Sequence, residues 1–394
     1  MARIRSVSIR RILNSHVEFT NEFVVQLTDG STGIGSASQG ETISIYEDNN
    51  TGADAEAFTR QLATDGILGT DTSQQELDEY LRQRFDVIGR NNAFAISLGF
   101  FHARTANLPL HEQFGTTSAG MRAPRLALNI LNGGWHAYTN PVLSDFPEFI
   151  LVARSNDIAA ALAAHASIQR LVRERLARLA TTNVAGNEVH CFVTRDNREC
   201  LDFLNDICAE LGITNDFDLM IDASAGDLWN DGRYQFAITD RASRSPDELS
   251  AYWTDLIQNH GLRFLEDPYR EQDTDSWRAL TAAQQRCIVV GDNFYSSDAA
   301  RIEAGARHGH TTGVVLKPNQ AGTVTGIINA ANAATRAKQH RIASHRSIST
   351  EELFLPRLTC ALGIEYIKIG PLITDYSSVL RLNEILRLTT LAAL

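Results

Sequence analysis

The fold of this chain can be inferred from the segment CIVVGDNFYSSDAARIEAGARHGHTTGVVLKPNQ, residues 287–320. An apolar run that ends at Asp292 is followed by an amphipathic stretch, DAARIEAGARHG, and by a second apolar run that ends at Lys317. This order of strand, helix and strand describes a βα unit, because parallel strands need a long crossover that is usually a helix. Each of the two strands ends on a side chain that can take part in chemistry.

The same pattern covers most of the chain after residue 118. Other apolar runs end on, or carry, a reactive side chain: His136 after RLALNI, Glu148 in DFPEFILVA, Asp222 in DLMID, Glu266 in RFLEDP, His345 in RIASHRS and Lys368 in YIKIG. Repeated βα units with polar strand ends predict a parallel (β/α)8 barrel, in which the active site lies at the carboxyl ends of the strands. A doubly wound open sheet is the alternative, but it does not place reactive groups at so many successive strand ends.

The first part of the chain has a different pattern. Residues 3–38 alternate like a β-meander, and Asp29-Gly30 between two extended runs indicates a hairpin. Residues 53–107 show apolar positions three and four apart, which is typical of helices. We therefore predict an α/β protein with a smaller α+β domain at residues 1–118 and a barrel domain at residues 119–394.

Composition limits the classes of partner. The formal net charge of −11 argues against nucleic acid and anionic membrane surfaces, because both call for a basic footprint. The chain has no apolar run long enough for a membrane span, and its first residues, MARIRSVSIRR, lack the apolar region of a signal peptide. Its five cysteines include no CxxC pair. We expect a cytoplasmic protein with a small-molecule substrate.

Three carboxylates, Asp222, Glu266 and Asp292, end three consecutive predicted strands. Brought together at a barrel mouth they repel one another unless a cation lies among them. Oxygen ligands without Cys or His favour Mg²⁺. The alternative is that each carboxylate is a separate strand-end cap or salt-bridge partner.

Two of the three lysines, Lys317 and Lys368, also end predicted strands; the third is Lys338. Two desolvated amines close together disfavour each other's charge, so that one can be neutral and act as a base. The alternative is that each lysine neutralises a carboxylate. A base, a metal and opposing carboxylates suit the removal of a proton α to a carboxylate, with the ene-diolate stabilised by Mg²⁺; Lys or His bases with Mg²⁺ are a documented pattern for this chemistry.

Eight ordered motifs resemble the enolase (phosphopyruvate hydratase) family: LNILNGGWHA, PEFILV, MIDASAGDLWNDGRYQF, FLEDP, VVGDN, LKPNQAGTVT, SHRSISTEELF and IKIG. They cover the whole predicted barrel in order, and the N-terminal meander with helices fits the same family. The resemblance implies a homodimer and a small phosphorylated carboxylate as substrate.

The resemblance also implies a role for each site residue. Asp222, Glu266 and Asp292 would bind the first Mg²⁺, and Ser38 would help to bind a second Mg²⁺ and the substrate. Lys317 would remove the α-proton, and Lys368 would hold the substrate carboxylate. Arg346 and Ser347 would grip the phosphate, with His345 beside the substrate, while His136 and Glu148 would face the leaving hydroxyl.

The chain departs from the family in the loops that complete the site. Where enolases have Gly-Asp-Glu-Gly-Gly, this chain reads TTNVAGNEVHC, so that the proton-donating glutamate becomes Asn187 or, with an insertion, Glu188. Asn293 replaces the carboxylate that follows Asp292. An asparagine cannot donate a catalytic proton as a carboxylic acid does.

Because the departures affect the half of the site that handles the leaving group, we interpret the chain as similar to carboxyphosphonoenolpyruvate synthase of phosphonate antibiotic pathways. Its second substrate would then be a nucleotide-activated phosphonoformate. The alternatives are an ordinary phosphopyruvate hydratase that keeps its acid through Glu188, and a catalytically silent relative. Intact metal acids and lysines argue against the silent relative.

Overall fold

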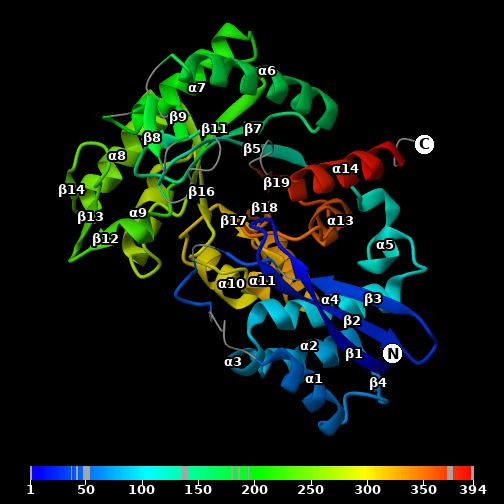
Figure 1. Cartoon of the computed structure of the whole chain (residues 1–394). Coiled ribbons are helices and arrows are strands. Elements are labelled where there is room, and N and C mark those ends of the chain that lie inside the picture. The colour runs from blue at the N-terminus through cyan, green and yellow to red at the C-terminus, as the bar shows by residue number, and fades with distance from the viewer. Residues whose placement is uncertain are drawn as a thin grey trace.

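The computed structural model of the chain describes residues 2–36, 38–40, 43–47, 54–134, 140–178, 181–184, 187–190, 192–193, 195–370 and 376–391, with the backbone alone over 181–193. An antiparallel sheet and a group of helices come first in the chain, and a closed barrel with surrounding helices follows. In Figure 1 the sheet and helices α1 to α4 lie together on one side of the barrel. The predicted fold class is confirmed.

The N-terminal sheet is the predicted meander. Strands β1 (Ala2–Leu13), β2 (Phe19–Leu27) and β3 (Thr32–Ser36) pair antiparallel in sequence order. The turn between β2 and β3 contains the predicted Asp29-Gly30 pair, and Gly30 has a φ of 92°, which glycine adopts without steric cost. A two-residue strand, β4 (Asp71–Thr72), adds to the other side of β1.

Five helices follow the sheet: α1 (Ala55–Thr64), α2 (Gln74–Arg82), α3 (Phe85–Ile88), α4 (Arg90–Thr105) and α5 (Leu110–Gln113). Helix α4 is buried along most of its length and packs closely on β3. A Cβ atom on Gly33 would lie 2.1 Å from the carbonyl oxygen of Gly99, so the close approach of strand and helix requires glycine there.

The barrel has eight strands: β5 (Arg125–Asn132), β7 (Glu148–Ala153), β11 (Phe217–Asp222), β15 (Leu262–Glu266), β16 (Ile288–Gly291), β17 (Gly313–Leu316), β18 (His340–Ser344) and β19 (Tyr366–Ile369). All eight lie on predicted apolar runs. Seven run parallel, but β7 is antiparallel to both of its neighbours, β5 and β11, so the expectation that every strand is parallel is wrong for β7. In the described part of the link from β5 to β7 there is only the short strand β6 (Val142–Leu143), whereas a parallel crossover usually needs a helix.

Helices α6 (Ile158–Leu176), α7 (Arg198–Glu210), α8 (Pro246–Asn259), α9 (Thr274–Ala283), α10 (Ala299–Arg307), α12 (Val324–Arg336), α13 (Phe354–Ala361) and α14 (Tyr376–Leu391) belong to the barrel domain. A short helix, α11 (Pro318–Ala321), begins directly after Lys317. Smaller strands form side sheets: β10 (Phe192–Val193) beside β6, β8 (Thr181–Val184) with β9 (Asn187–His190), and β12 (Trp229–Asn230), β13 (Arg233–Gln235) and β14 (Ser243–Arg244).

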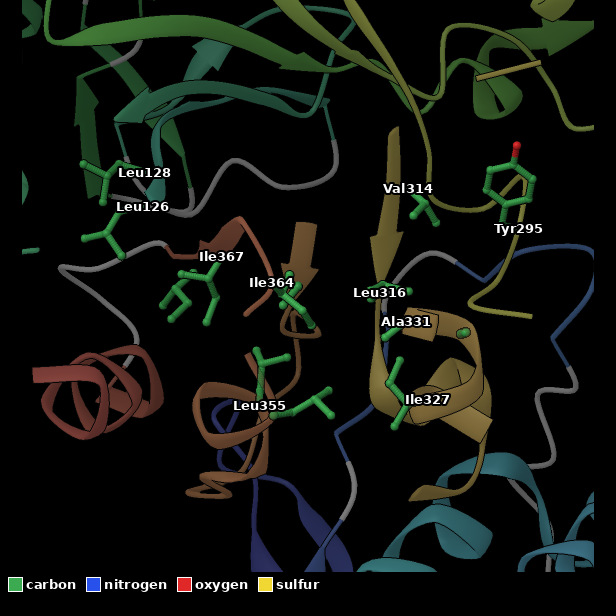
Figure 2. Close-up of a cluster of buried hydrophobic side chains, with 14 of the residues drawn as sticks. Leu126, Leu128, Tyr295, Val314, Leu316, Ile327, Ala331, Leu355, Ile364 and Ile367 are labelled. Atoms are coloured by element: carbon green, nitrogen blue, oxygen red, sulfur yellow. The ribbon is translucent and has the colours of Figure 1, made fainter. Parts of the chain in front are cut away.

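Alternating side chains of the barrel strands divide the core into two layers. Residues such as Val315 pack together in a cluster inside the barrel, whereas their sequence neighbours, such as Val314 and Leu316, belong to the cluster between strands and helices. Figure 2 shows Ile327 and Ala331 of α12 directed toward Leu316 of β17. Each large apolar side chain buried in this way contributes about 1.5–3 kcal/mol by leaving water.

A buried carboxylate joins the N-terminal helices to the barrel. Asp78 of α2 accepts hydrogen bonds from Ser97 Oγ of α4 at 2.6 Å and from the Thr325 backbone N–H, at the start of α12, at 2.7 Å. Burial raises the pKa of Asp78 despite these hydrogen bonds. The N-terminal helices and the barrel therefore share a polar contact as well as apolar packing. The domain boundary near residue 118 stays a prediction.

Among the described residues, no helix is both long enough and apolar enough to cross a membrane.

Candidate active site

Three buried carboxylates lie at one end of the barrel. Asp222 and Glu266 are the last residues of β11 and β15 and are register partners, and Asp292 follows β16 directly. Glu266 has no exposed surface, and the other two are buried as well. The sequence-predicted acids are therefore brought to the same barrel mouth, as the carboxyl ends of neighbouring parallel strands require.

Glu148 reaches this mouth by a different route. It is the first residue of β7, and it is the register partner of Asp222 on one side and of Asn132 on the other. Because β7 runs antiparallel, its amino end lies where the other strands have their carboxyl ends. Glu148, at the beginning of its strand, therefore lies at the same barrel mouth as the three acids at the ends of the other strands.

Lys368 of β19 is the centre of the acid group. Its Nζ donates to Glu148 Oε2 at 2.9 Å, to Asp222 Oδ2 at 3.0 Å and to both carboxylate oxygens of Glu266 at 2.8 Å. Burial disfavours the charged amine, but the attraction of Asp222, Glu148 and Glu266 outweighs burial and raises the pKa of Lys368 well above its ordinary value. Lys368 therefore fits the alternative of a lysine that neutralises carboxylates, and the expectation that one of the two lysines is neutral and acts as the base stays a prediction.

The two central acids differ in their affinity for a proton. Burial opposes ionisation of Asp222, yet Lys368 and Lys317 together lower its pKa to about 2. For Glu266, burial and then the charge of Asp222 dominate, and they raise its pKa well above the ordinary value. Two buried carboxylates this close cannot both ionise easily without further positive charge.

This donor set fits a hard divalent cation in its chemistry: the acids are all-oxygen, buried and mutually repelling. Across the described residues, however, no set of three or more His, Cys, Asp or Glu side chains is already arranged around a common metal position. The amine of Lys368 instead lies against Asp222 and Glu266. The assignment of Asp222, Glu266, Asp292 and Ser38 as Mg²⁺ ligands stays a prediction.

Lys317 is held at the mouth between β17 and α11. Its backbone N–H donates to Ser297 Oγ at 2.8 Å, and its Nζ contacts Asp292 Oδ2. The other oxygen of Asp292 accepts a hydrogen bond from Gln320 Nε2 at 3.2 Å. Lys317 therefore faces the third acid, on a strand separated from that of Lys368 by β18 alone.

Arg346, in the loop after β18, is buried against an acid that the sequence did not single out. Its Nη1 donates to Glu47 at 3.0 and 3.2 Å, and the side chains of Arg346 and Glu47 are 5% and 8% exposed. Glu47 comes from the loop region after β3 and reaches across to the barrel. The predicted anion-binding arginine thus contacts a carboxylate of the chain itself.

The remaining predicted residues lie around this arginine or outside the described structure. Ser38, His345 and Arg346 line one small cavity of about 30 Å³, and the Ser38 carbonyl accepts from Asn319 Nδ2 at 2.6 Å. Ser347 follows in the same loop, and its carbonyl accepts from Ser15 Oγ at 3.4 Å. His136 and the side chains of Asn187 and Glu188 lie outside the described residues; the backbone places Asn187 and Glu188 on β9, opposite β8.

Four residues of the site were missed by the sequence interpretation: Glu47, Asn129, Gln320 and Asp267. Asn129 Nδ2 donates to Glu148 Oε1 at 2.9 Å, and Gln320 Nε2 lies 3.2 Å from both Asp292 and Glu47. Asp267 accepts the backbone N–H groups of Asp292 and Asn293 at 3.0 and 2.8 Å.

Three of these missed residues, Asp267, Asn129 and Gln320, could have been found from the motifs, and Glu47 could not. Burial, reinforced by the charges of Asp292 and Asp222, raises the pKa of Asp267 well above its ordinary value. Asp267, Asn129 and Gln320 stand inside the motifs FLEDP, LNILNGGWHA and LKPNQAGTVT, which is a usable signal. Nothing in the sequence around Glu47 sets that glutamate apart.

Comparisons with known proteins agree with this geometry. Residues 121–392 match the family described as "Enolase, C-terminal TIM barrel domain". An enolase of Acidothermus cellulolyticus is 31% identical over 426 residues, which cover 98% of this chain and 95% of that protein. Enolases of Natronomonas pharaonis and Sulfolobus acidocaldarius are 29% and 27% identical, with 98% and 93% of this chain and 99% and 91% of those proteins covered. The chain therefore belongs to the enolase family.

Proposed function

We propose that the chain is an enolase-type carbon–oxygen lyase that converts 2-phosphoglycerate into phosphoenolpyruvate. The observation that carries the proposal is the placement of Lys317 beside Asp292, at the same mouth as Asp222 and Glu266. The names of the relatives support this reaction better than any other enolpyruvyl chemistry.

In this proposal the residues of the mouth divide into three tasks. Lys317 takes the proton α to the substrate carboxylate, while Lys368 keeps positive charge beside the acids and holds that carboxylate. Arg346 binds the phosphate together with Ser347, and His345 lies beside the substrate. Asp222, Glu266 and Asp292 would hold Mg²⁺, as is general in enolases, and a second Mg²⁺ would involve Ser38; bound Mg²⁺ stabilises the negative charge of an ene-diolate.

Glu148 belongs to the leaving-group side. Lys368 and Asn129 each bond one of its two carboxylate oxygens, so its orientation is fixed from both sides. It would face the leaving hydroxyl with His136. Glu188, at the start of β9, would donate the proton if its side chain reaches the site, and Asn187 could not.

A second candidate is the synthesis of a carboxyphosphonoenolpyruvate from an enolpyruvyl precursor and a nucleotide-activated phosphonoformate. The observation that favours it is Asn293, which stands where enolases have a second carboxylate and whose carbonyl accepts a hydrogen bond from Ser44 Oγ at 2.8 Å. The side chain next to Asp292 is therefore neutral, which suits a different leaving or incoming group.

A direct assay separates the two candidates. Purified protein is incubated with 2-phosphoglycerate and Mg²⁺, and phosphoenolpyruvate is followed by its absorbance, with exchange of the α-proton with solvent measured in parallel. Turnover comparable to a housekeeping enolase supports the hydratase. Proton exchange without dehydration favours the synthase, and the absence of both contradicts the lyase proposal.

We also propose a homodimer. Leu13, Val17 and Phe19, at the turn between β1 and β2, are 49%, 76% and 66% exposed, and neighbouring exposed apolar side chains can form a contact surface. Light scattering after size exclusion tests this: a mass of one chain at micromolar concentration contradicts the dimer, and a Val17→Ser/Phe19→Ser variant should be monomeric.

A further inference from the structure

We propose that Glu47 determines the anion specificity of the site: its carboxylate occupies the position at Arg346 that a phosphoryl group takes, and the phosphoryl group binds by displacing it. The inference rests on the proposed function only in taking Arg346 to be the anion-binding residue. Glu47 has no counterpart among the roles that the family resemblance assigns.

The contact between the two residues has the features of a ligand site that is already filled. Arg346 Nη1 lies 3.0 and 3.2 Å from the two oxygens of Glu47, and both side chains are almost fully buried. A buried guanidinium needs an anion, because the cost of removing its charge from water is otherwise uncompensated. Glu47 supplies that anion from within the chain.

Separate contacts deliver Glu47 to this position. Ser44 Oγ donates to the Asn293 carbonyl at 2.8 Å, which fixes the start of the segment 43–47 on the loop after β16. Arg301 stacks over the ring of Tyr46 at 4.3 Å. Gln39 exchanges two backbone hydrogen bonds with Ile348, next to Arg346 and Ser347, the proposed phosphate clamp. The chain is therefore attached at three points before Glu47, which hold the described segment 43–47 against the barrel and place the Glu47 carboxylate beside Arg346.

Gln320 connects Glu47 to the base side of the mouth. Its Nε2 lies 3.2 Å from Glu47 Oε1 and 3.2 Å from Asp292 Oδ1, and Asp292 contacts Lys317. When an anion displaces Glu47, this amide loses one of its two acceptors and becomes available to the incoming group. Anion binding at Arg346 is thereby linked to the surroundings of Lys317.

An internal carboxylate at this position selects among anions. A carboxylate ligand carries one negative charge, as Glu47 does, so its attraction to Arg346 is no stronger than that of Glu47. Glu47 also competes at the high effective concentration of a tethered group. A phosphoryl group brings nearly two charges and three acceptor oxygens, so it can outcompete Glu47. The site should therefore accept phosphoryl or phosphonyl groups and reject simple carboxylates.

The test measures binding of inorganic phosphate by calorimetry and by the thermal shift it causes, at constant Mg²⁺. In Glu47→Gln the guanidinium loses the charge of this carboxylate, so the variant should be less heat-stable than the wild type without phosphate and should bind phosphate on the order of tenfold more tightly. Acetate, which the wild type should bind negligibly, should also bind to Glu47→Gln. Glu47→Asp keeps the negative charge on a shorter side chain that reaches less far toward Arg346. Its affinity for phosphate should lie between those of the wild type and of Glu47→Gln.

Two control variants separate charge from loop loosening. Glu22→Gln removes a glutamate of similar burial, 10% exposed and 2.6 Å from Arg10, in the N-terminal sheet, and should leave phosphate affinity unchanged. Ser44→Ala loosens the segment while keeping the carboxylate. Because this segment presents Glu47, Ser44→Ala should tighten phosphate binding in the same direction but by less than Glu47→Gln does. If Ser44→Ala tightens phosphate binding and Glu47→Gln does not, the effect comes from the loop and the proposal is overturned.

A variant of the clamp itself distinguishes this proposal from the proposed function. If Arg346→Gln abolishes phosphate binding while Glu47→Gln and Glu47→Asp bind phosphate no more tightly than the wild type, the clamp stands and the role of Glu47 is wrong. If phosphate binds equally well without Arg346, the clamp is elsewhere, and both the role of Glu47 and the assignment of Arg346 fail.

Discussion

Glu148 and Asp222 face each other as register partners across the antiparallel pair of β7 and β11, and the amine of Lys368 bonds them both. The single reversed strand of the barrel thereby brings a fourth carboxylate to the mouth. Since Lys368 also bonds Glu266, one amine holds three acids that would otherwise repel one another.

Lys368→Met should therefore destabilise the folded protein by roughly 3–5 kcal/mol in the absence of Mg²⁺, because it leaves buried carboxylates without their cation. Urea unfolding with and without chelator measures this loss, and Mg²⁺ should restore part of it. Lys338→Met is the matched control, since Lys338 follows α12 away from the mouth and its loss should cost less than about 0.5 kcal/mol. Equal losses in both variants would argue against the central role of Lys368.

Lys317→Ala should abolish exchange of the substrate α-proton with solvent, because it removes the amine that takes the proton. Mg²⁺ binding, followed by calorimetry, should remain largely intact, since the three acids stay in place. Lys338→Ala again provides the control and should exchange the proton at the wild-type rate. Exchange that persists in Lys317→Ala would assign the base to another residue.

Glu266→Ala should remove the stabilisation that Mg²⁺ gives to the wild type, because the variant lacks the most deeply buried of the three predicted ligands. The melting temperature is measured against Mg²⁺ concentration. Glu365→Gln is the control: Glu365 lies before β19, at the opposite end of the barrel, where it pairs with Arg341 at 3.0 Å. An Mg²⁺ response that is unchanged in Glu266→Ala would exclude Glu266 from the metal site.

The strands and their reactive ends could be predicted from the sequence because two signals coincide there: each apolar run is long enough for a strand, and a reactive side chain follows at its end. Apolar runs that end on Asp222, Glu266, Asp292 and Lys317 identify both the barrel and its mouth, and the structure brings all four to one end. The direction of β7 could not be predicted, because alternation of side chains is the same for a strand in either orientation.

Contacts between distant segments were also beyond the sequence. Glu47 is separated from Arg346 by most of the chain, and no local pattern indicates that the two meet. The raised pKa of Lys368 likewise depends on how many carboxylates surround it, which only the closed barrel fixes. The residue types at the strand ends predict which side chains lie at the barrel mouth. They do not predict which of these side chains form ion pairs or hydrogen bonds with each other.

A buried histidine far from this chemistry should control stability at acidic pH. His165 of α6 is buried, and burial lowers its pKa to about 4, against an ordinary value of 6.5. Gln169, whose Oε1 accepts from Asn140 Nδ2 at 2.6 Å, has its Nε2 3.1 Å from His165 Nε2, so this ring nitrogen accepts a hydrogen bond and must carry no proton. Protonation of His165 would set two donors against each other.

The sign of the effect follows from proton binding in the two states. Between pH 6.5 and about 4 the unfolded chain binds a proton at His165 and the folded chain does not, so stability is complete above pH 6.5 and falls as the pH drops through this window, by up to about 3 kcal/mol. Urea unfolding of the wild type and of His165→Leu over this range measures the difference in slope. At pH 8 both states are neutral at this position, so a difference there reports packing alone. Identical pH slopes in the two proteins would show that His165 is not the group responsible.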